Sequence, residues 1–474
     1  MLSTLRIERA SFRDSSGCTW SGPDHVFRAN WDQQGSTSKA LETLLAQLQE
    51  EGLWVRSRAI DPAALPAFQA GACSLPQRAW EHPRVFFPSY AHEWPAAMLH
   101  CAAELTLELN ERLLAIGWEL KDATPTNVLF EGPSPLFIDH LSPAPRTPGQ
   151  LGWTGYGQFI RTFLIPLCLH QLHGLPLAWL HLAQRDGVSP EEASRQLSRY
   201  DRLRPSVFGL ITLPALISRS GEWRLGRSLS AMKHGDEAAG RAVTARILGH
   251  LRKQLKRWAP PEARGTVWSE YDQAGESYTP EGLAAKEAFI RTALDDCRPG
   301  TVLDLGCNTG RYSRLAAGLG ARVVAVDSDA VCVARLWKQA RAGHLDIQPL
   351  VMNLGRPSPA LGWENGEEAP FLERVAGRFD MVFALALIHH LLVRERVPLA
   401  YVAAHFARQT TRWAVLEWVP PSDPQFRRLA GPYWGLYEAC GQEAFEAALA
   451  PHFRVLRQCL LPGNERLLYL LEAL

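Results

Sequence analysis

Short apolar runs alternate with helical patterns along the part of the chain that begins near residue 271. Most of these runs are continuous, as in strands of a parallel sheet that are buried on both faces. The expected strands are 301–305, 321–327, 347–352, 379–387 and 413–417. Two more runs, 453–461 and 467–471, are joined by Pro462-Gly463-Asn464, which is a hairpin turn signal. The pattern predicts an α/β fold, in which a seven-stranded Rossmann-like sheet closes with an antiparallel hairpin.

The remainder of the chain has a different pattern. Residues 1–95 combine strand-like runs with one amphipathic helix at about 38–49, which predicts a small α+β lobe. The strand-like runs are 18–31, 52–59 and 84–87. A mainly helical lobe is expected over 96–230, and a helix with a linker over 231–270. We therefore predict an α+β N-terminal domain followed by a separate domain at 271–474.

Composition narrows the class of protein. A chain of 474 residues that is 46% hydrophobic and 21% charged, with a net charge of +1, is typical of ordinary globular proteins. This charge gives no general attraction to nucleic acid or to an anionic membrane. The nine cysteines form no metal-ligand spacing, so no metal is expected. The most apolar stretch, 163–183, is interrupted by prolines and polar residues, and no signal peptide is evident, so we expect a cytoplasmic protein without a membrane span.

A glycine-rich turn follows the first of the expected parallel strands. Asp304 ends an apolar run, and Gly306-Cys-Asn308-Thr-Gly310 comes before a helical segment. Such a turn lets a ligand approach the backbone and reach the N-terminus of the helix, but alone it is shared with many nucleotide sites. The next strand ends in Asp327, where a carboxylate is placed to accept hydrogen bonds from ribose hydroxyls. Asn353 follows the third strand, and its amide has the chemistry to bind an adenine edge.

The D-x-G-x-x-x-G loop and the closing hairpin together resemble class I S-adenosylmethionine (SAM)-dependent methyltransferases over about 271–474. The resemblance implies SAM as cofactor, with contacts from the loop, the ribose-binding acid and the adenine-binding amide. These residues are Asp304, Gly306, Asn308, Gly310, Asp327 and Asn353. Asn308 stands where the family has a glycine, and asparagine tolerates a positive φ better than most residues. A doubly wound domain that binds another nucleotide is the alternative.

Several residues are candidates for the transfer site. His389 and His390 follow the fourth strand at the edge of the sheet where acceptors bind, so either is a candidate general base or a pocket-lining residue. Glu417, at the tip of the fifth strand, is a second candidate base or an anchor for a cationic acceptor. Tyr271 and Tyr278 precede the first helix, where aromatic residues of similar methyltransferases lie across SAM. Plain packing is their alternative role.

A second constellation lies in the N-terminal half. The spacing of Asp122, Asn127 and Asp139 resembles the catalytic loop and metal-binding aspartate of protein kinases and aminoglycoside-type phosphotransferases. The resemblance implies a base at Asp122, and ATP with Mg²⁺ held by Asn127 and Asp139. The chain has no G-x-G-x-x-G loop and no early-strand lysine, and Arg28 is the basic residue best placed on a strand. The alternative is an accessory domain in which Asp122 and Asn127 cap a turn and Asp139 pairs with an arginine.

The whole chain also resembles a group of bacterial nodulation-protein-like methyltransferases. The resemblance is carried by Leu-Lys-Asp-Ala at 120–123, Phe-Ile-Asp-His-Leu-Ser at 137–142, Tyr-Gly-Gln-Phe at 156–159, Ala-Leu-Ile-His-His-Leu at 386–391 and Glu-Trp-Val-Pro at 417–420. We expect a methyltransferase that acts on a small-molecule, saccharide or lipid-linked acceptor, with the N-terminal domain assisting acceptor binding. The alternatives are a bifunctional kinase-methyltransferase, or a methyltransferase with a pseudokinase-like module that binds a partner. Nucleic acid is not expected as a substrate, because no N-P-P-[YFW] motif follows the fourth strand, and no sequence signal indicates an oligomeric state.

Overall fold

The computed structural model describes residues 5–8, 11, 13, 17–31, 38–65, 76–219, 237–261 and 278–474. The chain folds into two compact units, and each is described here by itself. Unit 1 comprises Met1–Phe130, Pro135–Glu262 and Leu361–Glu368. Unit 2 comprises Glu131–Ser134, Ala263–Ala360 and Ala369–Leu474.

Unit 1 contains a five-stranded antiparallel sheet with the strand order β1-β2-β3-β5-β4. The strands are β1 (Arg6–Ile7), β2 (Gly17–Ser21), β3 (His25–Asn30), β4 (Arg58–Ile60) and β5 (Arg78–Pro83). Helix α1 (Lys39–Glu50) lies between β3 and β4 in the sequence, and Ser38 caps its N-terminus by accepting the amide of Leu41. Leu41, Leu45 and Leu48 of α1 are buried, which confirms the predicted apolar face. The predicted strand at 84–87 is wrong: β5 ends at Pro83, and after the Arg84 amide donates to the carbonyl oxygen of Asp24 the chain leaves the sheet.

The other part of unit 1 is mainly helical, as the sequence predicted. Its longest helices are α2 (Ala96–Ala115) and α11 (Glu237–Arg257), which pack against each other. Shorter helices are α3 (Tyr156–Phe159), α4 (Ile165–His173), α5 (Leu177–Ala183), α6 (Pro190–Gln196), α7 (Arg199–Leu203), α8 (Pro205–Val207) and α9 (Leu213–Arg219). Strands β6 (Trp118–Leu120) and β9 (Pro143–Pro145) form one small sheet, and β7 (Val128–Glu131) and β8 (Ser134–Phe137) another. The described helices include none that is long and apolar enough to cross a membrane.

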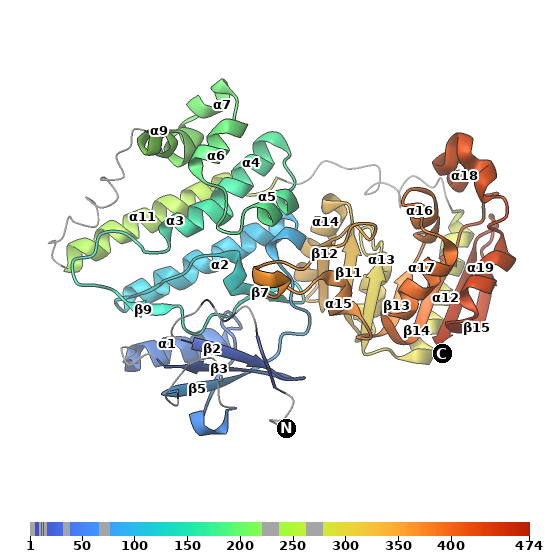
Figure 1. The fold of residues 1–474 in the computed structure, drawn as a ribbon, viewed down its shortest axis with the longest axis horizontal. Coiled ribbons are helices and arrows are strands. Elements are labelled where there is room, and N and C mark those ends of the chain that lie inside the picture. Colours follow the sequence, from blue (N-terminus) through green and yellow to red (C-terminus); the bar gives the residue numbers. More distant parts are fainter. Residues whose placement is uncertain are drawn as a thin grey trace. The chain divides into compact units, whose positions relative to one another are not determined.

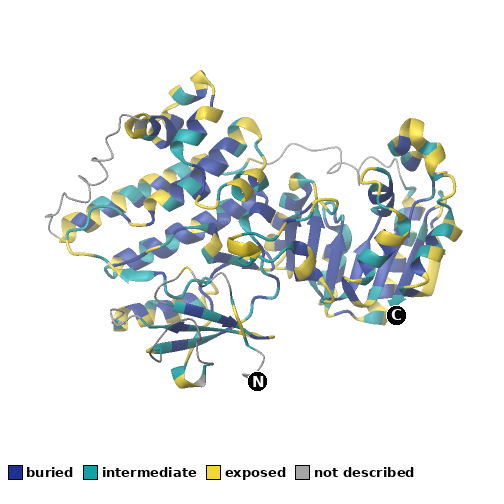
Figure 2. Cartoon of the chain, in the orientation of Figure 1, coloured by how far each residue is buried: buried dark blue, intermediate teal, exposed yellow. Residues whose placement is uncertain are grey.

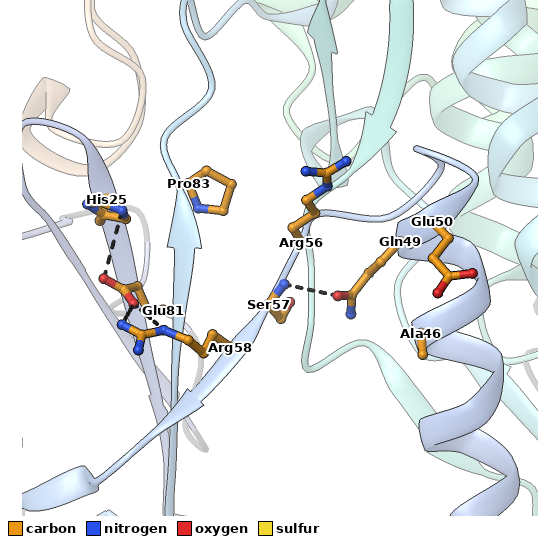
Figure 3. A pocket seen from close by; sticks show the side chains of 9 residues that line it. All are labelled: His25, Ala46, Gln49, Glu50, Arg56, Ser57, Arg58, Glu81 and Pro83. Carbon is orange, nitrogen blue, oxygen red and sulfur yellow. Dashed lines mark hydrogen bonds and ion pairs between the residues drawn. The ribbon is translucent and has the colours of Figure 1, made fainter.

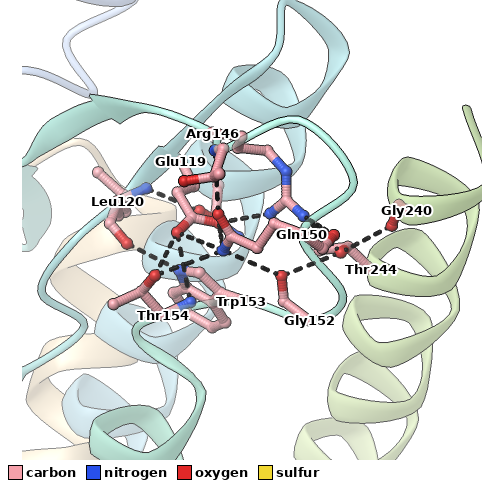
Figure 4. Close-up of polar contacts among 11 residues, drawn as sticks. Glu119, Leu120, Arg146, Gln150, Gly152, Trp153, Thr154, Gly240 and Thr244 are labelled. Carbon is pink, nitrogen blue, oxygen red and sulfur yellow. Dashed lines mark hydrogen bonds and ion pairs between the residues drawn. The ribbon is translucent and has the colours of Figure 1, made fainter. Parts of the chain in front are cut away.

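A buried polar network stabilises this helical part of unit 1 (Figure 4). The carboxylate of Glu119 in β6 forms an ion pair with Arg146, and both side chains are almost fully buried. Gln150 and Thr154 also donate hydrogen bonds to Glu119. Arg146 donates to Thr244 of α11 over 2.9 Å, so the network joins α11 to the segment that follows β9.

Unit 2 is built on a seven-stranded sheet with the order β12-β11-β10-β13-β14-β16-β15 (Figure 1). Five strands are parallel, and β16 pairs antiparallel with both β14 and β15. The strands are β10 (Thr301–Leu305), β11 (Arg322–Asp327), β12 (Ile347–Val351), β13 (Phe379–Ala384), β14 (Thr410–Trp418), β15 (Phe453–Leu460) and β16 (Leu467–Ala473). The parallel sheet and the closing hairpin that the sequence predicted are therefore confirmed.

The helices of unit 2 connect and cover these strands. They are α12 (Pro280–Cys297), α13 (Arg311–Gly318), α14 (Ala330–Ala342), α15 (Phe371–Val375), α16 (Ile388–Val393), α17 (Leu399–Ala407), α18 (Pro424–Ala430) and α19 (Gln442–Leu449). The central strands are almost entirely buried (Figure 2), as strands covered on both faces must be. The strand order reverses between β10 and β13, and ligands of open α/β sheets bind at the carboxyl edge beside such a reversal.

Candidate active site

The loop between β10 and α13 has a backbone shaped by three residues with positive φ. Gly306, Asn308 and Gly310 have φ angles of 75°, 49° and 76°. Asn308 thus adopts the left-handed conformation that the glycine usual at this place would supply. A Cβ atom on Gly310 would lie 2.2 Å from Leu336, so this position has no room for a side chain. The loop forms a narrow cradle of backbone at the N-terminus of α13, which suits a ligand that must approach the main chain.

Asp327 at the tip of β11 faces this loop. One carboxylate oxygen accepts the amide of Asn308 at 2.8 Å, and the other accepts the amide of Asp329 at 2.9 Å. Burial raises the pKa of Asp327, and the two amide hydrogen bonds counteract that rise. The amide of Met352, at the end of β12, donates to the carbonyl oxygen of Asp327 over 2.8 Å. The tips of β11 and β12 therefore meet beside the loop.

Two other predicted SAM contacts have different surroundings. Asp304 is buried within β10, where the hydroxyl of Ser313 donates to it at 2.5 Å, and burial raises its pKa to about 6. This hydrogen bond links β10 to α13, the two elements that flank the loop. Asn353 is exposed after β12, and its side-chain oxygen accepts the amide of Gly355 at 2.8 Å. Asn353 follows β12 and Asp327 ends β11, so both residues lie at the same edge of the sheet.

The two histidines predicted for the transfer site lie on α16. Their rings are 4.2 Å apart, and His389 is 4% exposed. Burial, the neighbouring ring and Arg466 lower the pKa of His389 well below its usual value. Burial, Arg394 and Arg466 lower the pKa of His390 to about 4. Both rings are therefore neutral at pH 7, and Nδ1 of His389 has no hydrogen-bond partner in the described structure.

Glu417, at the end of β14, is fully buried in a cluster of polar side chains. Lys286 of α12 donates to one carboxylate oxygen over 2.6 Å, and the hydroxyl of Tyr278 donates to the other over 2.6 Å. Lys286 also donates to the Tyr278 hydroxyl at 3.1 Å. Tyr278 thus takes part in the site, whereas Tyr271 lies outside the described residues.

Arg466, which directly precedes β16, completes this cluster. Its Nε and Nη2 atoms donate to Asp423 over 2.8 and 3.2 Å, and its guanidinium group lies 4.6 Å from the centre of the Tyr278 ring. The third nitrogen, Nη1, is 3.9 Å from Glu417 and has no hydrogen-bond partner among the described residues. We call Lys286, Glu417, Asp423 and Arg466 the charged quartet.

Sequence reasoning missed three members of the charged quartet and Ser313. One signal was available for Lys286, which occupies a position of the buried face of α12 between Gly282 and Phe289. A lysine at an apolar-face position requires a buried partner. No comparable signal exists for Asp423 or Arg466, because charged residues near turns are usually exposed.

In unit 1 the structure places the three kinase-like candidates as follows. Asp139 forms an ion pair with Arg28 of β3 at 2.5 Å. The carboxylate of Asp122 accepts a hydrogen bond from Gln158 at 2.9 Å, and Asn127 donates to the Asp122 carbonyl oxygen at 3.4 Å. Asp122 and Asn127 are thus neighbours, and Asp139 pairs with Arg28; this arrangement is compatible with both the kinase-like and the accessory-domain interpretations, which stay predictions.

Unit 1 also has a cavity of about 490 Å³ beside α1, β4 and β5 (Figure 3). Glu81 contacts Arg58 at 2.8 Å and His25 at 3.9 Å, and Gln49 accepts the amide of Ser57. None of the kinase-like candidates lines this cavity. Nowhere in the described part of the chain do three His, Cys, Asp or Glu side chains form a group that could hold a metal ion.

Comparison with known proteins identifies the class first. The sequence model of a methyltransferase domain family matches residues 278–430. The match covers the loop, Asp327 and the strands on both sides of the order reversal, and the protein is a SAM-dependent methyltransferase.

A full-length relative identifies the family. Nodulation protein NoeA of Rhizobium meliloti (strain 1021) is 31% identical over 465 residues, which are 98% of this chain and 95% of NoeA. The chain therefore belongs to the NoeA family, and the predicted resemblance to nodulation-protein-like methyltransferases is confirmed.

Two solved structures are also similar. N-methyltransferase NodS from Bradyrhizobium japonicum WM9, in complex with S-adenosyl-L-homocysteine (SAH), is 14% identical with a TM-score of 0.32, over 43% of this chain and 95% of NodS. The bifunctional kinase-methyltransferase WbdD is 18% identical with a TM-score of 0.30, over 42% of this chain and 41% of WbdD. The kinase-like character of the N-terminal part stays a prediction.

Proposed function

We propose that this enzyme transfers the methyl group of SAM to a small-molecule, saccharide or lipid-linked acceptor, and that the N-terminal domain assists acceptor binding. The observation that carries the proposal is the division of the sheet edge at the order reversal. The loop and Asp327 lie on the β10-β11-β12 side, and His389 and the charged quartet lie on the β13-β14-β16 side. A donor site beside an acceptor site is the arrangement that in-line displacement requires.

The proposed roles on the donor side follow from donor and acceptor chemistry. The Asp327 carboxylate accepts hydrogen bonds from the ribose hydroxyls, and the side-chain amide of Asn353 binds the adenine edge. The backbone of Gly306, Asn308 and Gly310 approaches the cofactor, and the positive φ angles of these three residues support this role. Bound SAM would supply an electrophilic methyl group on a sulfonium, and the protein would orient it.

The proposed roles on the acceptor side are mainly positional. A general base for reaction near neutral pH needs a pKa near 7, and the pKa values of His389 and His390 are far below that. We therefore favour pocket-lining roles for both rings. Glu417 is neutralised by Lys286, which favours an anchoring role over proton abstraction.

Calorimetry with SAH tests the proposal. The wild-type chain should bind SAH at micromolar concentrations, and Asp327→Ala should bind at least tenfold more weakly, which corresponds to about 1.4 kcal/mol. Asp346→Ala is the matched control, because this aspartate directly precedes β12, is exposed and pairs with Arg322. No binding of SAM or SAH at millimolar concentration, or an unchanged affinity of Asp327→Ala, would overturn the assignment.

The bifunctional alternative is favoured by one observation, the ion pair between Asp139 and Arg28. A kinase-like phosphotransferase uses a lysine on an early strand at the nucleotide site, and Arg28 of β3, which contacts Asp139, is a candidate for that role. Calorimetry with ATP and Mg²⁺ tests this alternative. Binding by the wild-type chain that is lost in Asp139→Asn supports it, and the idea is dropped if Asp122→Asn changes neither turnover nor ATP binding.

A further inference from the structure

Arg466 has an unused hydrogen-bond donor in the interior of unit 2. The side chain is 1% exposed, and its Nη1 atom has no hydrogen-bond partner in the described structure. Two of its other nitrogens are fixed on Asp423, so the guanidinium group cannot rotate to satisfy Nη1 without breaking that pair. Nη1 lies 3.9 Å from Glu417, too far for a hydrogen bond, and a buried donor without one costs free energy that a bound ligand group can recover.

The position of Arg466 assigns this donor to the acceptor side of the sheet. Arg466 directly precedes β16, whose neighbour is β14, and β14 follows β13 in the sheet order. The cradle for SAM lies at β10 and β11, on the other side of the order reversal. A second unpaired atom, Nδ1 of His389, belongs to the acceptor side as well, and Arg466 is close enough to lower the pKa of that ring.

Charge determines what kind of group fits Nη1. The charged quartet contains two carboxylates and two cations, and is therefore neutral by itself. His389 is neutral, and bound SAM adds the positive charge of its sulfonium. An anion beside Arg466 would neutralise that added charge in a buried place, where an uncompensated charge is expensive. A guanidinium nitrogen also makes its strongest hydrogen bonds to carboxylate and phosphate oxygens.

We propose that Arg466, through Nη1, binds an oxyanion of the methyl acceptor, a carboxylate or a phosphate group, beside the sulfonium of SAM. The inference rests on the proposed function and adds the substrate class. Arg466 is thereby a specificity-determining residue, and the neutral charged quartet holds its guanidinium group in place.

Binding of inorganic phosphate and acetate to the SAM-saturated full chain, whose cofactor carries the sulfonium charge, tests this proposal. We expect both anions to bind with millimolar affinity by calorimetry, and Arg466→Gln to weaken binding at least tenfold. Arg457→Gln is the matched control, because Arg457 lies on the exposed side of the same hairpin and pairs with Asp296. No anion binding up to 100 mM, or equal binding by Arg466→Gln, would overturn the proposal.

The same variants separate the two possible sources of the oxyanion. SAH affinity should change by less than twofold in Arg466→Gln; a tenfold loss would assign Nη1 to the carboxylate of the cofactor and overturn the assignment to the acceptor. If the wild-type chain does not bind SAH, the proposed function fails first. Because Arg466→Gln leaves Asp423 buried without its partner, the double variant Asp423→Asn/Arg466→Gln and the charge-retaining Arg466→Lys are measured beside it, with circular dichroism as the check of folding.

Discussion

Each unit of this protein contains a buried network of charged side chains, and the two networks differ in how completely they are satisfied. In unit 1 the Glu119 carboxylate accepts hydrogen bonds from Arg146, Gln150 and Thr154. Arg146 also donates to the carbonyl oxygen of Gln150 and to Thr244. Neither Glu119 nor Arg146 has a buried polar atom without a partner in the described structure.

The charged quartet of unit 2 is more deeply buried, since all four of its residues are buried whereas Gln150 and Thr154 of the unit 1 network are partly or fully exposed, yet Nη1 of Arg466 is left without a hydrogen bond. In a satisfied network, folding alone uses all of the hydrogen-bonding capacity of the buried groups. An unsatisfied one retains binding capacity for a ligand. The comparison therefore separates a network that stabilises the fold from one that we assign to recognition.

The largest expected effect comes from breaking each ion pair. Arg146→Met should lower the free energy of unfolding by about 3–5 kcal/mol, because Glu119 remains buried without a cation. Arg466→Gln should cost a similar amount through Asp423. Urea denaturation followed by circular dichroism measures both.

Removing both partners then distinguishes the networks. Glu119→Gln/Arg146→Met and Asp423→Asn/Arg466→Gln should each recover most of the lost stability, because no charge remains unpaired. Phosphate binding to the SAM-loaded protein should persist in the first double variant and stay lost in the second. Phosphate binding by the second double variant would contradict the assignment of the charged quartet to anion recognition.

A pair of glycines compares the loop after β10 in unit 2 with the surroundings of the Glu119 network in unit 1. Gly310→Ala should cost about 3 kcal/mol, because Cβ would meet Leu336 and the φ of 76° disfavours a side chain. Gly240→Ala should cost about 1–2 kcal/mol, because its Cβ would lie 2.8 Å from the carbonyl oxygen of Gln150. Only Gly310→Ala should also weaken SAH binding, by at least tenfold; equal SAH affinity in the two variants would contradict the cradle.

The pH dependence of stability should have opposite signs for Asp304, which is buried in unit 2, and His140, which is partly buried in unit 1. The pKa of Asp304 is raised to about 6 from 3.8, so its contribution to stability is complete below about pH 4 and is lost as the pH rises through 6. Burial lowers the pKa of His140 in unit 1 to about 3 from 6.5, so its contribution is complete above pH 6.5 and is lost as the pH falls toward 3.

Each group contributes a slope of at most about 1.4 kcal/mol per pH unit to the free energy of unfolding. Comparing the wild-type chain with a variant that lacks the group isolates that slope. Between pH 4 and 6, Asp304→Asn should remove a loss of stability with rising pH, and His140→Gln should remove a gain. Urea denaturation at half-unit pH steps measures both slopes. If the two slopes have the same sign, the pKa shift of either Asp304 or His140 has the wrong direction.

The smallest effect is expected at Asn308. Asn308→Ala should cost about 1 kcal/mol, because alanine is less tolerant of a φ of 49° and the side-chain hydrogen bond to the amide of Thr309 is lost. Asn308→Gly should change stability by only a few tenths of a kcal/mol and should keep SAH affinity within about twofold. Thermal unfolding and calorimetry measure the pair, and a larger loss in the glycine variant would show that the Asn308 side chain itself binds the cofactor.

The fold of unit 2 was predictable because its signals are local. Continuous apolar runs, a glycine-rich turn and the Pro462-Gly463-Asn464 turn each depend on a few neighbouring residues, and together they identify the sheet and its closing hairpin. The strand at 84–87 was mispredicted because an apolar run after Pro83 is equally compatible with a buried loop. The assignments of Asp304, Asp327 and Asn353 to SAM remain predictions, although the structure brings the latter two to one edge of the sheet.

The sequence by itself determined the class of fold, the donor-side loop and membership of the methyltransferases, because short stretches of sequence determine backbone conformation and strand burial. Only the tertiary structure decided which charged residues are buried together. Lys286, Glu417, Asp423 and Arg466 lie on separate elements, and their pairing depends on long-range packing of α12, β14, α18 and the β15-β16 hairpin. The hydrogen-bond capacity left over at Arg466 is likewise visible only after every partner has been placed in three dimensions.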